Sequence, residues 1–289
     1  MTLICPECHV RQQNIDLQAC NQCQLPFENL NGIRVFFSRK DQSSELFKDY
    51  KKNYDLISED DLADSIQDLN YLHTQTEKLF SYLPQHKEQS ICEIGVGQGH
   101  LLKKLATLDP KQLIGVDIAP AYLSKLLSEG VPYNAFLANA ENLPFENAFD
   151  LVIAADVLEH VLNAGNFLHS IHKAMKTNGT LVVRVPYLED YSTYSSFKGC
   201  PYDFVHLRNF SAETLKILLE GAGFKVHKFH YDGFFLHRFR WCQPWFLPAR
   251  LLRKITYLIY GNQLNTIPNW LGNLLIRPAE ITAVCIKKD

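Results

Sequence analysis

The sequence of 289 residues lacks a strong excess of either charge and lacks a long apolar run. Its 29 lysines and arginines and 31 aspartates and glutamates give a net charge of −2, so no global field favours a polyanion or a membrane. No apolar run follows Met1, which argues against a secretory signal. The longest uncharged stretch, Ile255–Ile276, holds glycines, a proline and several amides, and is too polar for a membrane-spanning helix. These absences predict a cytoplasmic protein whose membrane contact, if it has any, is peripheral.

Eight cysteines without a signal sequence indicate a reducing compartment, where metal binding is favoured over disulfides. A segment as small as the N-terminal head has too little core to fold without a metal. We therefore predict a structural Zn²⁺ ribbon over residues 1–37, whose closed coordination leaves no position for catalysis. A redox role is disfavoured because no βαβ pattern surrounds the cysteines. The predicted ligands are two C-x-x-C pairs separated by 11 residues, namely Cys5, Cys8, Cys20 and Cys23.

A glycine-rich stretch, Ile91–Leu102, organises the rest of the chain. It has the pattern of a short buried strand, a turn with three glycines and the first residues of a helix. Glycine lets a ligand approach the backbone closely, and the N–H groups that open the helix face whatever lies above the turn. A second predicted strand, Leu113–Asp117, ends in a carboxylate about 20 residues further on, where nucleotide-binding α/β folds place an acid for ribose hydroxyls. The pattern predicts a nucleotide-binding α/β domain.

The same stretch resembles motif I, E/D-x-G-x-G-x-G, of the class I S-adenosyl-L-methionine (SAM) dependent methyltransferases, in particular those of type 11/23. Asn139–Phe145 is similar to the family's adenine-contacting turn, Phe149–Val161 to its fourth strand and following loop, and Asn178–Val183 to its turn into strand five. The four ordered matches cover residues 91–231. The resemblance implies a Rossmann-like α/β fold over residues 91–289, with a mostly parallel seven-stranded sheet. Alternating strand and helix patterns between residues 91 and 219 independently indicate such a sheet.

The resemblance also implies where SAM binds. Glu93 and the glycine turn would line its methionine part, and Asp117 would bind its ribose. Position 139 is usually aspartate in the family; asparagine accepts a hydrogen bond but brings no charge, which puts the affinity for adenine in doubt. The implied cofactor residues are Glu93, Gly95, Val96, Gly97, Gln98, Gly99, Asp117, Ile118, Asn139, Ala140 and Asp156.

The candidates for the catalytic step are Glu159, His160 and His206. Asp156, Glu159 and His160 would share one face if a helix began at Asp156. Together with His206 they resemble the divalent-metal site of small-RNA 2′-O-methyltransferases and ubiquinone-pathway O-methyltransferases, which implies Mg²⁺ or Mn²⁺. Two other readings stay open. Either histidine acts as a base without metal, or these side chains only position the acceptor.

Residues 38–90 are expected to form a helical linker followed by a cofactor-covering helix. Residues 38–58 are polar, and from Leu62 to Leu83 apolar residues recur at a spacing of three to four. Ser58 is the predicted N-cap of this amphipathic helix and Pro84 its end. In the resembled family a helix here covers the cofactor pocket; plain packing is the alternative.

An insertion at residues 232–280 separates two predicted final strands, Lys225–Tyr231 and Ile281–Lys287, and is far longer than a hairpin loop. The insertion has three interpretations. It could contact a membrane surface through residues 234–277, bind a polyanion, or form a helical subdomain with an ordinary aromatic core. The stretch from Gly233 to Ala279 has no acidic residue, but it has six basic residues and all three tryptophans: Arg238, Arg240, Arg250, Arg253, Lys254, Arg277, Trp241, Trp245 and Trp270.

These observations favour a SAM-dependent methyltransferase that acts on oxygen of a small-molecule, glycan or lipid-linked acceptor. The first alternative is an rRNA or tRNA methyltransferase, motivated by the basic insertion and by the head, which resembles Trm112-like zinc ribbons. Its nucleic-acid partner is less expected at a net charge of −2. The second alternative is a catalytically silent partner protein that keeps the fold. The intact glycines and Asp117 argue against it, and Asn139 argues for it. The sequence names no oligomeric state.

Overall fold

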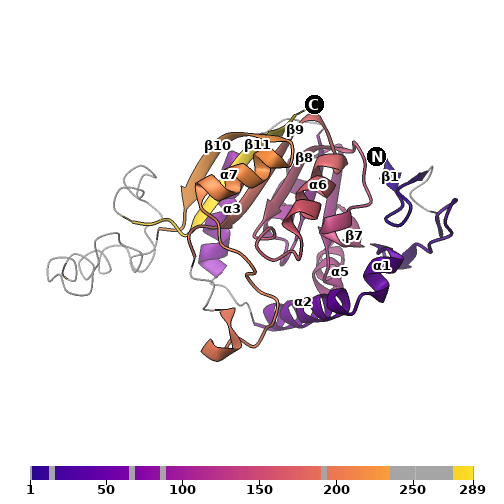
Figure 1. Ribbon diagram of the computed structural model, residues 1–289, viewed down its shortest axis with the longest axis horizontal. Coiled ribbons are helices and arrows are strands. Elements are labelled where there is room, and N and C mark those ends of the chain that lie inside the picture. Colours follow the sequence, from indigo (N-terminus) through magenta and orange to yellow (C-terminus); the bar gives the residue numbers. More distant parts are fainter. Residues whose placement is uncertain are drawn as a thin grey trace.

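The computed structural model describes residues 2–12, 17–64, 69–84, 89–189, 194–234, 251 and 276–288. Its main sheet has the strand order β10-β11-β9-β8-β5-β6-β7-β4-β3 (Figure 1). The strands are β3 (Glu28–Leu30), β4 (Ile33–Phe36), β5 (Ser90–Ile94), β6 (Gln112–Asp117), β7 (Asn134–Ala138), β8 (Phe149–Ala155), β9 (Met175–Pro186), β10 (Phe224–Asp232) and β11 (Glu280–Lys287).

The seven strands from β10 to β7 confirm the predicted α/β sheet. Strands β7, β6, β5, β8 and β9 run parallel, and β11 lies antiparallel to both β9 and β10. The order reverses between β5 and β8, because the chain builds β6 and β7 on one side of β5 and the remaining strands on the other. Ligands of such sheets bind outside the carboxyl ends of the strands at this switch point. The glycine-rich turn follows β5 and therefore lies there.

Two strands from the cysteine-rich head extend the sheet beyond the expected seven. β4 pairs in parallel with β7, and β3 forms an antiparallel hairpin with β4. The ring of Phe36 in β4 lies 5.6 Å from that of Phe136 in β7, so this hairpin joins the main core and covers the edge of β7. A separate two-stranded sheet is formed by β1 (Leu3–Ile4) and β2 (Arg11–Gln12).

Helices cover both faces of the sheet. α6 (Ala164–Ala174) and α7 (Ala212–Gly221) lie on the front face in Figure 1. Their apolar residues share one buried cluster with the side chains on that face of the strands. α3 (Leu69–Tyr82), α4 (His100–Ala106) and α5 (Pro120–Ser128) contribute to a second cluster on the opposite face. The site is thus framed by a sheet with two packed cores.

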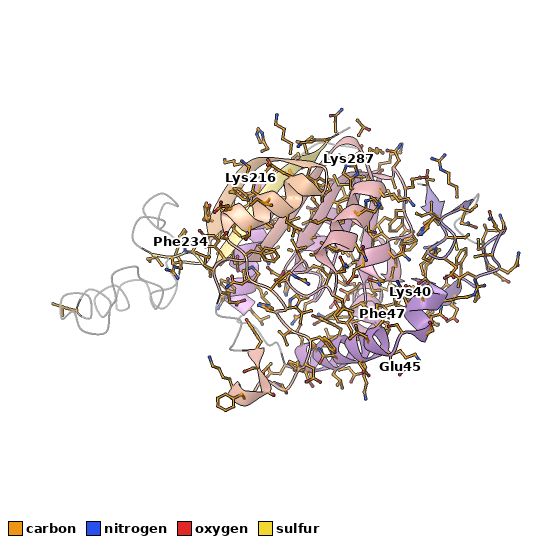
Figure 2. All side chains as sticks on the ribbon, in the orientation of Figure 1. Lys40, Glu45, Phe47, Lys216, Phe234 and Lys287 are labelled. Carbon is orange, nitrogen blue, oxygen red and sulfur yellow. The ribbon has the colours of Figure 1, made fainter. Side chains whose placement is uncertain are left out.

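The helices before the glycine-rich turn differ from the prediction. α1 (Arg39–Ser43) is followed by α2 (Glu45–Ala63), which is capped by Ser44. The predicted N-cap at Ser58 is wrong, because Ser58 is buried inside α2 and its hydroxyl donates to the carbonyl of Asp55 at 2.8 Å. A serine that bonds to the preceding turn fits a helix interior. Phe47 faces inward from α2, whereas Lys40 and Glu45 are exposed (Figure 2).

α2 lies next to the carboxyl edge of the sheet. The Gln98 side chain in the glycine-rich turn donates to the carbonyl of Asp61 near the end of α2 at 3.1 Å. The middle of α2 is joined to the loop after β9, since Asn53 accepts from the backbone N–H of Asp203 at 3.1 Å. α3 packs on α4 with Leu79 buried, and its Tyr71 hydroxyl donates to Oε1 of Glu280 at the first residue of β11, opposite the carboxyl end of β9. A cofactor-covering helix within residues 38–90 stays a prediction.

Most of the predicted insertion lies outside the described residues. Within 232–280 the structure describes only 232–234, 251 and 276–280, so the basic and aromatic residues predicted to contact a membrane, apart from Phe234 and Arg277, fall outside them. Among the helices that are described, none combines the length and apolarity needed to cross a bilayer. Membrane contact through residues 234–277 stays a prediction.

Candidate cofactor and acceptor site

The glycine-rich turn contains one glycine that borders open space and two that are packed. A Cβ at Gly95 would lie 2.4 Å from Val157 Cγ2, and one at Gly99 would lie 2.1 Å from Leu126 Cδ2. A Cβ at Gly97 would have no atom within 4 Å, although its φ is also positive, at +49°. Gly95 and Gly99 therefore allow close packing, and Gly97 leaves room for a ligand above the turn.

Asp117 at the end of β6 organises this turn. Its Oδ2 accepts the N–H of Gly97 at 3.2 Å, and its Oδ1 accepts the N–H of Ala119 at 2.9 Å. Burial raises the pKa of the Asp117 carboxyl, while these backbone N–H groups act in the opposite direction. Each oxygen keeps a second lone pair for another donor. Asp117 is thus a rigidly held acceptor beside the free space at Gly97.

Glu93 lies in the neighbouring strand, β5. Its Oε2 is buried and has no hydrogen-bond partner in the described part of the chain. Burial, and then the charge of Asp117, hold the pKa of the Glu93 carboxyl well above its ordinary value. A buried carboxyl oxygen without a partner is costly unless a ligand supplies a donor.

The predicted adenine turn follows β7 as the short 3-10 helix η1 (Ala140–Asn142). Asn139 caps it by accepting the N–H of Glu141 at 3.0 Å. The side-chain amide of Asn139 donates to Oδ1 of Asp41 at 2.8 Å. The glycine turn, Asp117 and Asn139 follow three adjacent parallel strands and lie along one edge, as the sequence predicts.

Glu159, His160 and His206 come together beyond the end of β8. One ligand atom from each lies within 4.8 Å of those of the other two. Glu159 is fully buried, and neither of its carboxylate oxygens has a hydrogen-bond partner in the described residues. Burial raises the pKa of Glu159 well above its ordinary value.

The two imidazoles of this cluster have their Nδ1 atoms occupied. His160 Nδ1 lies 3.0 Å from the carbonyl oxygen of Val205, which can only accept, so this nitrogen carries the proton. His206 Nδ1 bonds to Oε2 of Glu189. The Nε2 atoms of both histidines are therefore the ones available to an acceptor or a metal.

The sequence profile of a family described as "methyltransferase domain" matches residues 66–228, which is more than half of the chain. The chain belongs to this family. A probable S-adenosylmethionine-dependent methyltransferase of Mycobacterium tuberculosis is 26% identical over 157 residues, which are 54% of this chain and 56% of that protein. A tRNA U34 carboxymethyltransferase of Idiomarina loihiensis is 24% identical over 161 residues, covering 52% of this chain and 49% of that one. The chain thus spans about half the length of the curated relatives it matches.

Solved structures show the same fold at low identity. A Haloferax volcanii complex of the Trm112 methyltransferase activator with a methyltransferase aligns with a TM-score of 0.55, 15% identity and coverage of 83% of this chain and 98% of that one. A SAM-dependent methyltransferase of Thermotoga maritima aligns with a TM-score of 0.53, 20% identity and coverage of 85% and 100%. These likenesses establish the class I methyltransferase fold.

Asp156 is not a member of the Glu159 cluster. Residues 156–160 form a turn rather than a helix, and α6 begins only at Ala164. The φ of Asp156 is +56°, which stops a helix and which aspartate tolerates better than most residues. Both Asp156 oxygens bond to the buried guanidinium of Arg184 in β9. The predicted shared face of Asp156, Glu159 and His160 is therefore wrong, and no described contact supports Asp156 as a cofactor residue.

Glu189, the partner of His206, is a site residue that the sequence motifs do not predict. It follows the end of β9 at the same edge of the sheet as the other site residues. The Tyr194 hydroxyl donates to its second oxygen at 3.1 Å, and the Tyr194 ring lies 4.2 Å from that of His206. A carboxylate placed just after a predicted strand is the signal that would have found it.

The four predicted zinc ligands converge in the head. Cys5 Sγ lies 3.6 Å from Cys23 Sγ, Cys8 Sγ lies 3.5 Å from Cys20 Sγ, and all four sulfurs lie within 4.8 Å of one another. Tetrahedral Zn²⁺ with Zn–S bonds of about 2.3 Å requires S–S separations of about 3.8 Å, so the four thiols fit the ion. Zinc binding by this cluster stays a proposal.

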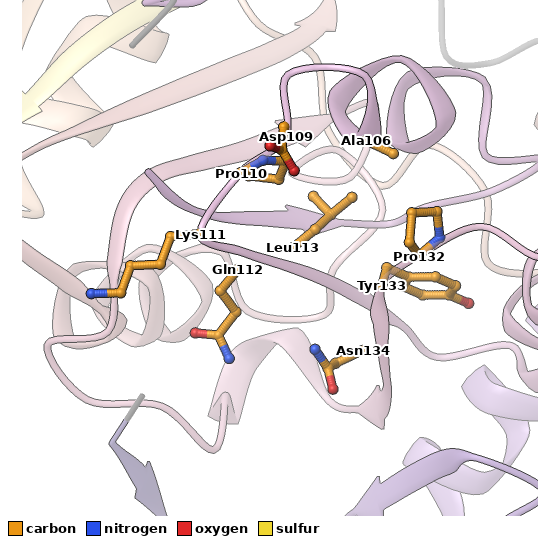
Figure 3. A pocket seen from close by; sticks show the side chains of 9 residues that line it. All are labelled: Ala106, Asp109, Pro110, Lys111, Gln112, Leu113, Pro132, Tyr133 and Asn134. Carbon is orange, nitrogen blue, oxygen red and sulfur yellow. The ribbon is translucent and has the colours of Figure 1, made fainter. Parts of the chain in front are cut away.

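A hollow lies at the opposite edge of the sheet, at the amino ends of β6 and β7 (Figure 3). Gln112 and Asn134, the first residues of these strands, line it together with Pro110 and Pro132. Ligands of parallel α/β sheets bind at the carboxyl ends instead. The hollow is therefore separate from the cofactor and acceptor site.

We predict a distinct pH dependence of stability from His160. Burial and the neighbouring His206 lower its pKa from 6.5 to about 4, so folding keeps it neutral where the unfolded chain binds a proton. The contribution of the neutral His160 to the free energy of unfolding is complete above pH 6.5 and is lost as the pH falls toward 4. Between pH 7 and pH 5 the wild type should lose about 2 kcal/mol more unfolding free energy than His160→Gln, measured by urea denaturation. Identical pH dependences would contradict the burial of a neutral His160.

Proposed function

We propose that this chain transfers the methyl group of SAM to a hydroxyl oxygen of a small-molecule, glycan or lipid-linked acceptor. One observation carries the proposal. The open space at Gly97, the held carboxylate of Asp117 and the Glu159 cluster lie outside the carboxyl ends of neighbouring strands in a methyltransferase-family domain. When bound, SAM supplies a methyl group on a positively charged sulfur.

The cofactor half of the site binds and orients. Asp117 accepts hydrogen bonds from the ribose hydroxyls, and Gly97 allows the ligand to approach the backbone. The unpartnered Oε2 of Glu93 accepts from the amino group of the methionine part. α2 would cover this edge of the sheet, exclude water and help to hold the acceptor oxygen against the methyl group that bound SAM would supply.

In the acceptor half, His206 is the base. Its Nδ1–H bonds to Glu189, so Nε2 presents a lone pair and the carboxylate stabilises the imidazolium that forms. Nε2 of His206 would take the proton of the acceptor hydroxyl as its oxygen takes the methyl group, and bound SAM would leave as S-adenosyl-L-homocysteine, which keeps the electron pair of the former sulfur–methyl bond. Burial and His206 lower the pKa of His160 to about 4, which makes His160 a poor base near neutral pH. It positions the acceptor beside Glu159.

A divalent cation is the competing occupant of this cluster. Without Asp156 the donors are one carboxylate and two imidazole nitrogens, a set that suits Mn²⁺ or another transition metal better than Mg²⁺, which prefers oxygen. A cation held there by Glu159, His160 and His206 would polarise the acceptor oxygen. Calorimetric titration with Mn²⁺ separates the two. Binding that is lost in His206→Gln would assign the cluster to a metal and overturn the role of His206 as a base.

The test of the function is titration of the purified protein with SAM, followed by transfer of labelled methyl groups to a panel of hydroxyl-bearing acceptors. We expect micromolar SAM binding, with His206→Gln lowering the transfer rate at unchanged SAM affinity. Absence of SAM binding would leave a silent partner protein as the function. Transfer to RNA but to no small acceptor would establish the RNA reading. That reading is supported by the relatives named as tRNA U34 carboxymethyltransferases.

The glycine-rich turn offers a matched pair of variants. Gly97→Ala puts a methyl group into the space proposed for SAM, so SAM affinity should fall at least about tenfold with only about 1 kcal/mol of lost stability from the positive φ. Gly99→Ala meets Leu126 instead and should cost about 2–4 kcal/mol of stability. Calorimetry and thermal unfolding of both variants check this. Wild-type SAM affinity in Gly97→Ala would place the ligand elsewhere.

A further inference from the structure

The extra strand β4 brings a segment of the head to the adenine side of the site. β4 pairs in parallel with β7, with Phe36 opposite Ala138, so the segments that follow these two strands both leave the sheet at its carboxyl edge. After β7 comes Asn139, and after β4 come Ser38 and α1. The edge therefore continues from the glycine turn through Asp117 and Asn139 to one more strand end.

Asp41 occupies that additional strand end. Its Oδ2 accepts from the backbone N–H and the hydroxyl of Ser38, at 3.0 and 2.7 Å, which completes the capping box of α1. Its Oδ1 accepts only from the side-chain amide of Asn139, at 2.8 Å, among the described residues. The oxygen of that amide already accepts from Glu141 N–H. A carboxylate in direct contact with Asn139 is thus supplied by Asp41, whereas position 139 itself brings no charge.

We propose that Asp41 is a cofactor-binding residue that accepts a hydrogen bond from the exocyclic amino group of the adenine in SAM. This rests on the proposed function, and it takes adenine to lie against Asn139 and Ala140, as the resemblance of Asn139–Phe145 to the family's adenine-contacting turn predicts. The amino group needs an acceptor, and Oδ1 of Asp41 keeps a lone pair for it. The pair of Asp41 and Asn139 therefore supplies together the carboxylate that a single residue at position 139 does not.

The head holds both members of this pair in place. In α1, the backbone N–H of Arg39 donates to Oε2 of Glu7 at 2.8 Å, and its guanidinium donates to the carbonyl of Cys23 at 2.8 Å. In η1, the Asn142 side chain donates to the carbonyl of Pro6 at 2.7 Å. Asp41 and Asn139 each lie within three residues of one of these contacts. The segment Cys5–Cys8, which we call the first cysteine knuckle, thereby contacts both α1 and η1, the two elements beside Asn139.

The test compares the demethylated cofactor, S-adenosyl-L-homocysteine, with its analogue S-inosyl-L-homocysteine, which carries a carbonyl oxygen in place of the adenine amino group. In the zinc-loaded full-length protein, calorimetry should show a preference of at least about tenfold for the adenosyl compound, since a carboxylate repels the carbonyl oxygen. Asp41→Asn should reduce this preference below about threefold, because an amide can pair with either compound. Ser38→Ala removes the α1 cap but keeps the carboxylate, and should leave the preference unchanged.

The exchange variant Asp41→Asn/Asn139→Asp provides the second arm. It moves the carboxylate from position 41 to position 139 and keeps a carboxylate–amide pair between the two positions. The preference for the adenosyl compound should therefore return to within about threefold of the wild type. If Asp41→Asn weakens both compounds equally, or changes neither, Asp41 only caps α1 and the proposal is overturned. If the wild type binds neither compound, the proposed function itself fails, which is a different result from a lost preference.

Discussion

Asp117→Ala is expected to lower the affinity for SAM by about 100-fold while the fold is retained. Each hydrogen bond from a ribose hydroxyl to a carboxylate contributes at least about 1.5 kcal/mol, and the loss of two such bonds gives a change of about this size. The substitution also removes the acceptor of Gly97 N–H, which holds the glycine-rich turn in shape. Titration calorimetry with SAM measures the loss.

Retention of the fold follows from the burial of Asp117. Removing a buried carboxylate whose pKa is raised by burial relieves a desolvation cost, which offsets the two lost backbone hydrogen bonds. Asp150→Ala is the matched control. That carboxylate binds Ser90 N–H and Lys176 at the opposite edge of the sheet, so its loss should reduce stability without changing SAM affinity. Unchanged SAM affinity in Asp117→Ala would refute the ribose assignment.

The parts of the fold that the sequence predicts correctly are those encoded locally. The turn after β5, the end of β6 and the turn after β7 each lie within a short motif, and the strands between them are buried apolar runs. β3 and β4 are three and four residues long, and neither has the alternation that marks a strand. They form because β7 offers an open edge and Phe36 fills the core beside it. That reason lies in the fold, not in the segment.

The contacts that sequence reasoning missed join residues far apart in the chain or depend on one backbone angle. Asp41 and Asn139 are 98 residues apart, and only the pairing of β4 with β7 brings them together. The spacing of Asp156, Glu159 and His160 suits a helix, but the left-handed φ of Asp156 directs its side chain to Arg184. The direction of the Asp156 side chain is decided by the buried guanidinium of Arg184, and no local sequence pattern reveals that Arg184 lies beside it.

Replacing Cys5 and Cys8 with serine is expected to abolish zinc binding, from one zinc per chain in the wild type to none by elemental analysis. The four sulfurs provide the entire proposed coordination shell, and two remaining thiolates do not hold the ion. Because so small a head depends on its metal to fold, the Cys5–Cys8 knuckle should lose its structure as well. Cys200→Ser, which changes a cysteine outside the cluster, should keep one zinc per chain.

The loss of zinc should also weaken SAM binding, by about tenfold, although no cysteine of the head is proposed to touch SAM. The Cys5–Cys8 knuckle supplies the Pro6 carbonyl to Asn142 in η1 and the Glu7 carboxylate to Arg39 in α1, and these contacts hold the two elements proposed to lie beside the adenine. Without these contacts α1 and η1 are no longer held in place. SAM must then order them when it binds, and the free energy of this ordering weakens its affinity. If zinc is lost and SAM affinity does not change, the head is independent of the cofactor site. A zinc that persists in the Cys5/Cys8 variant would show that these two cysteines are not ligands.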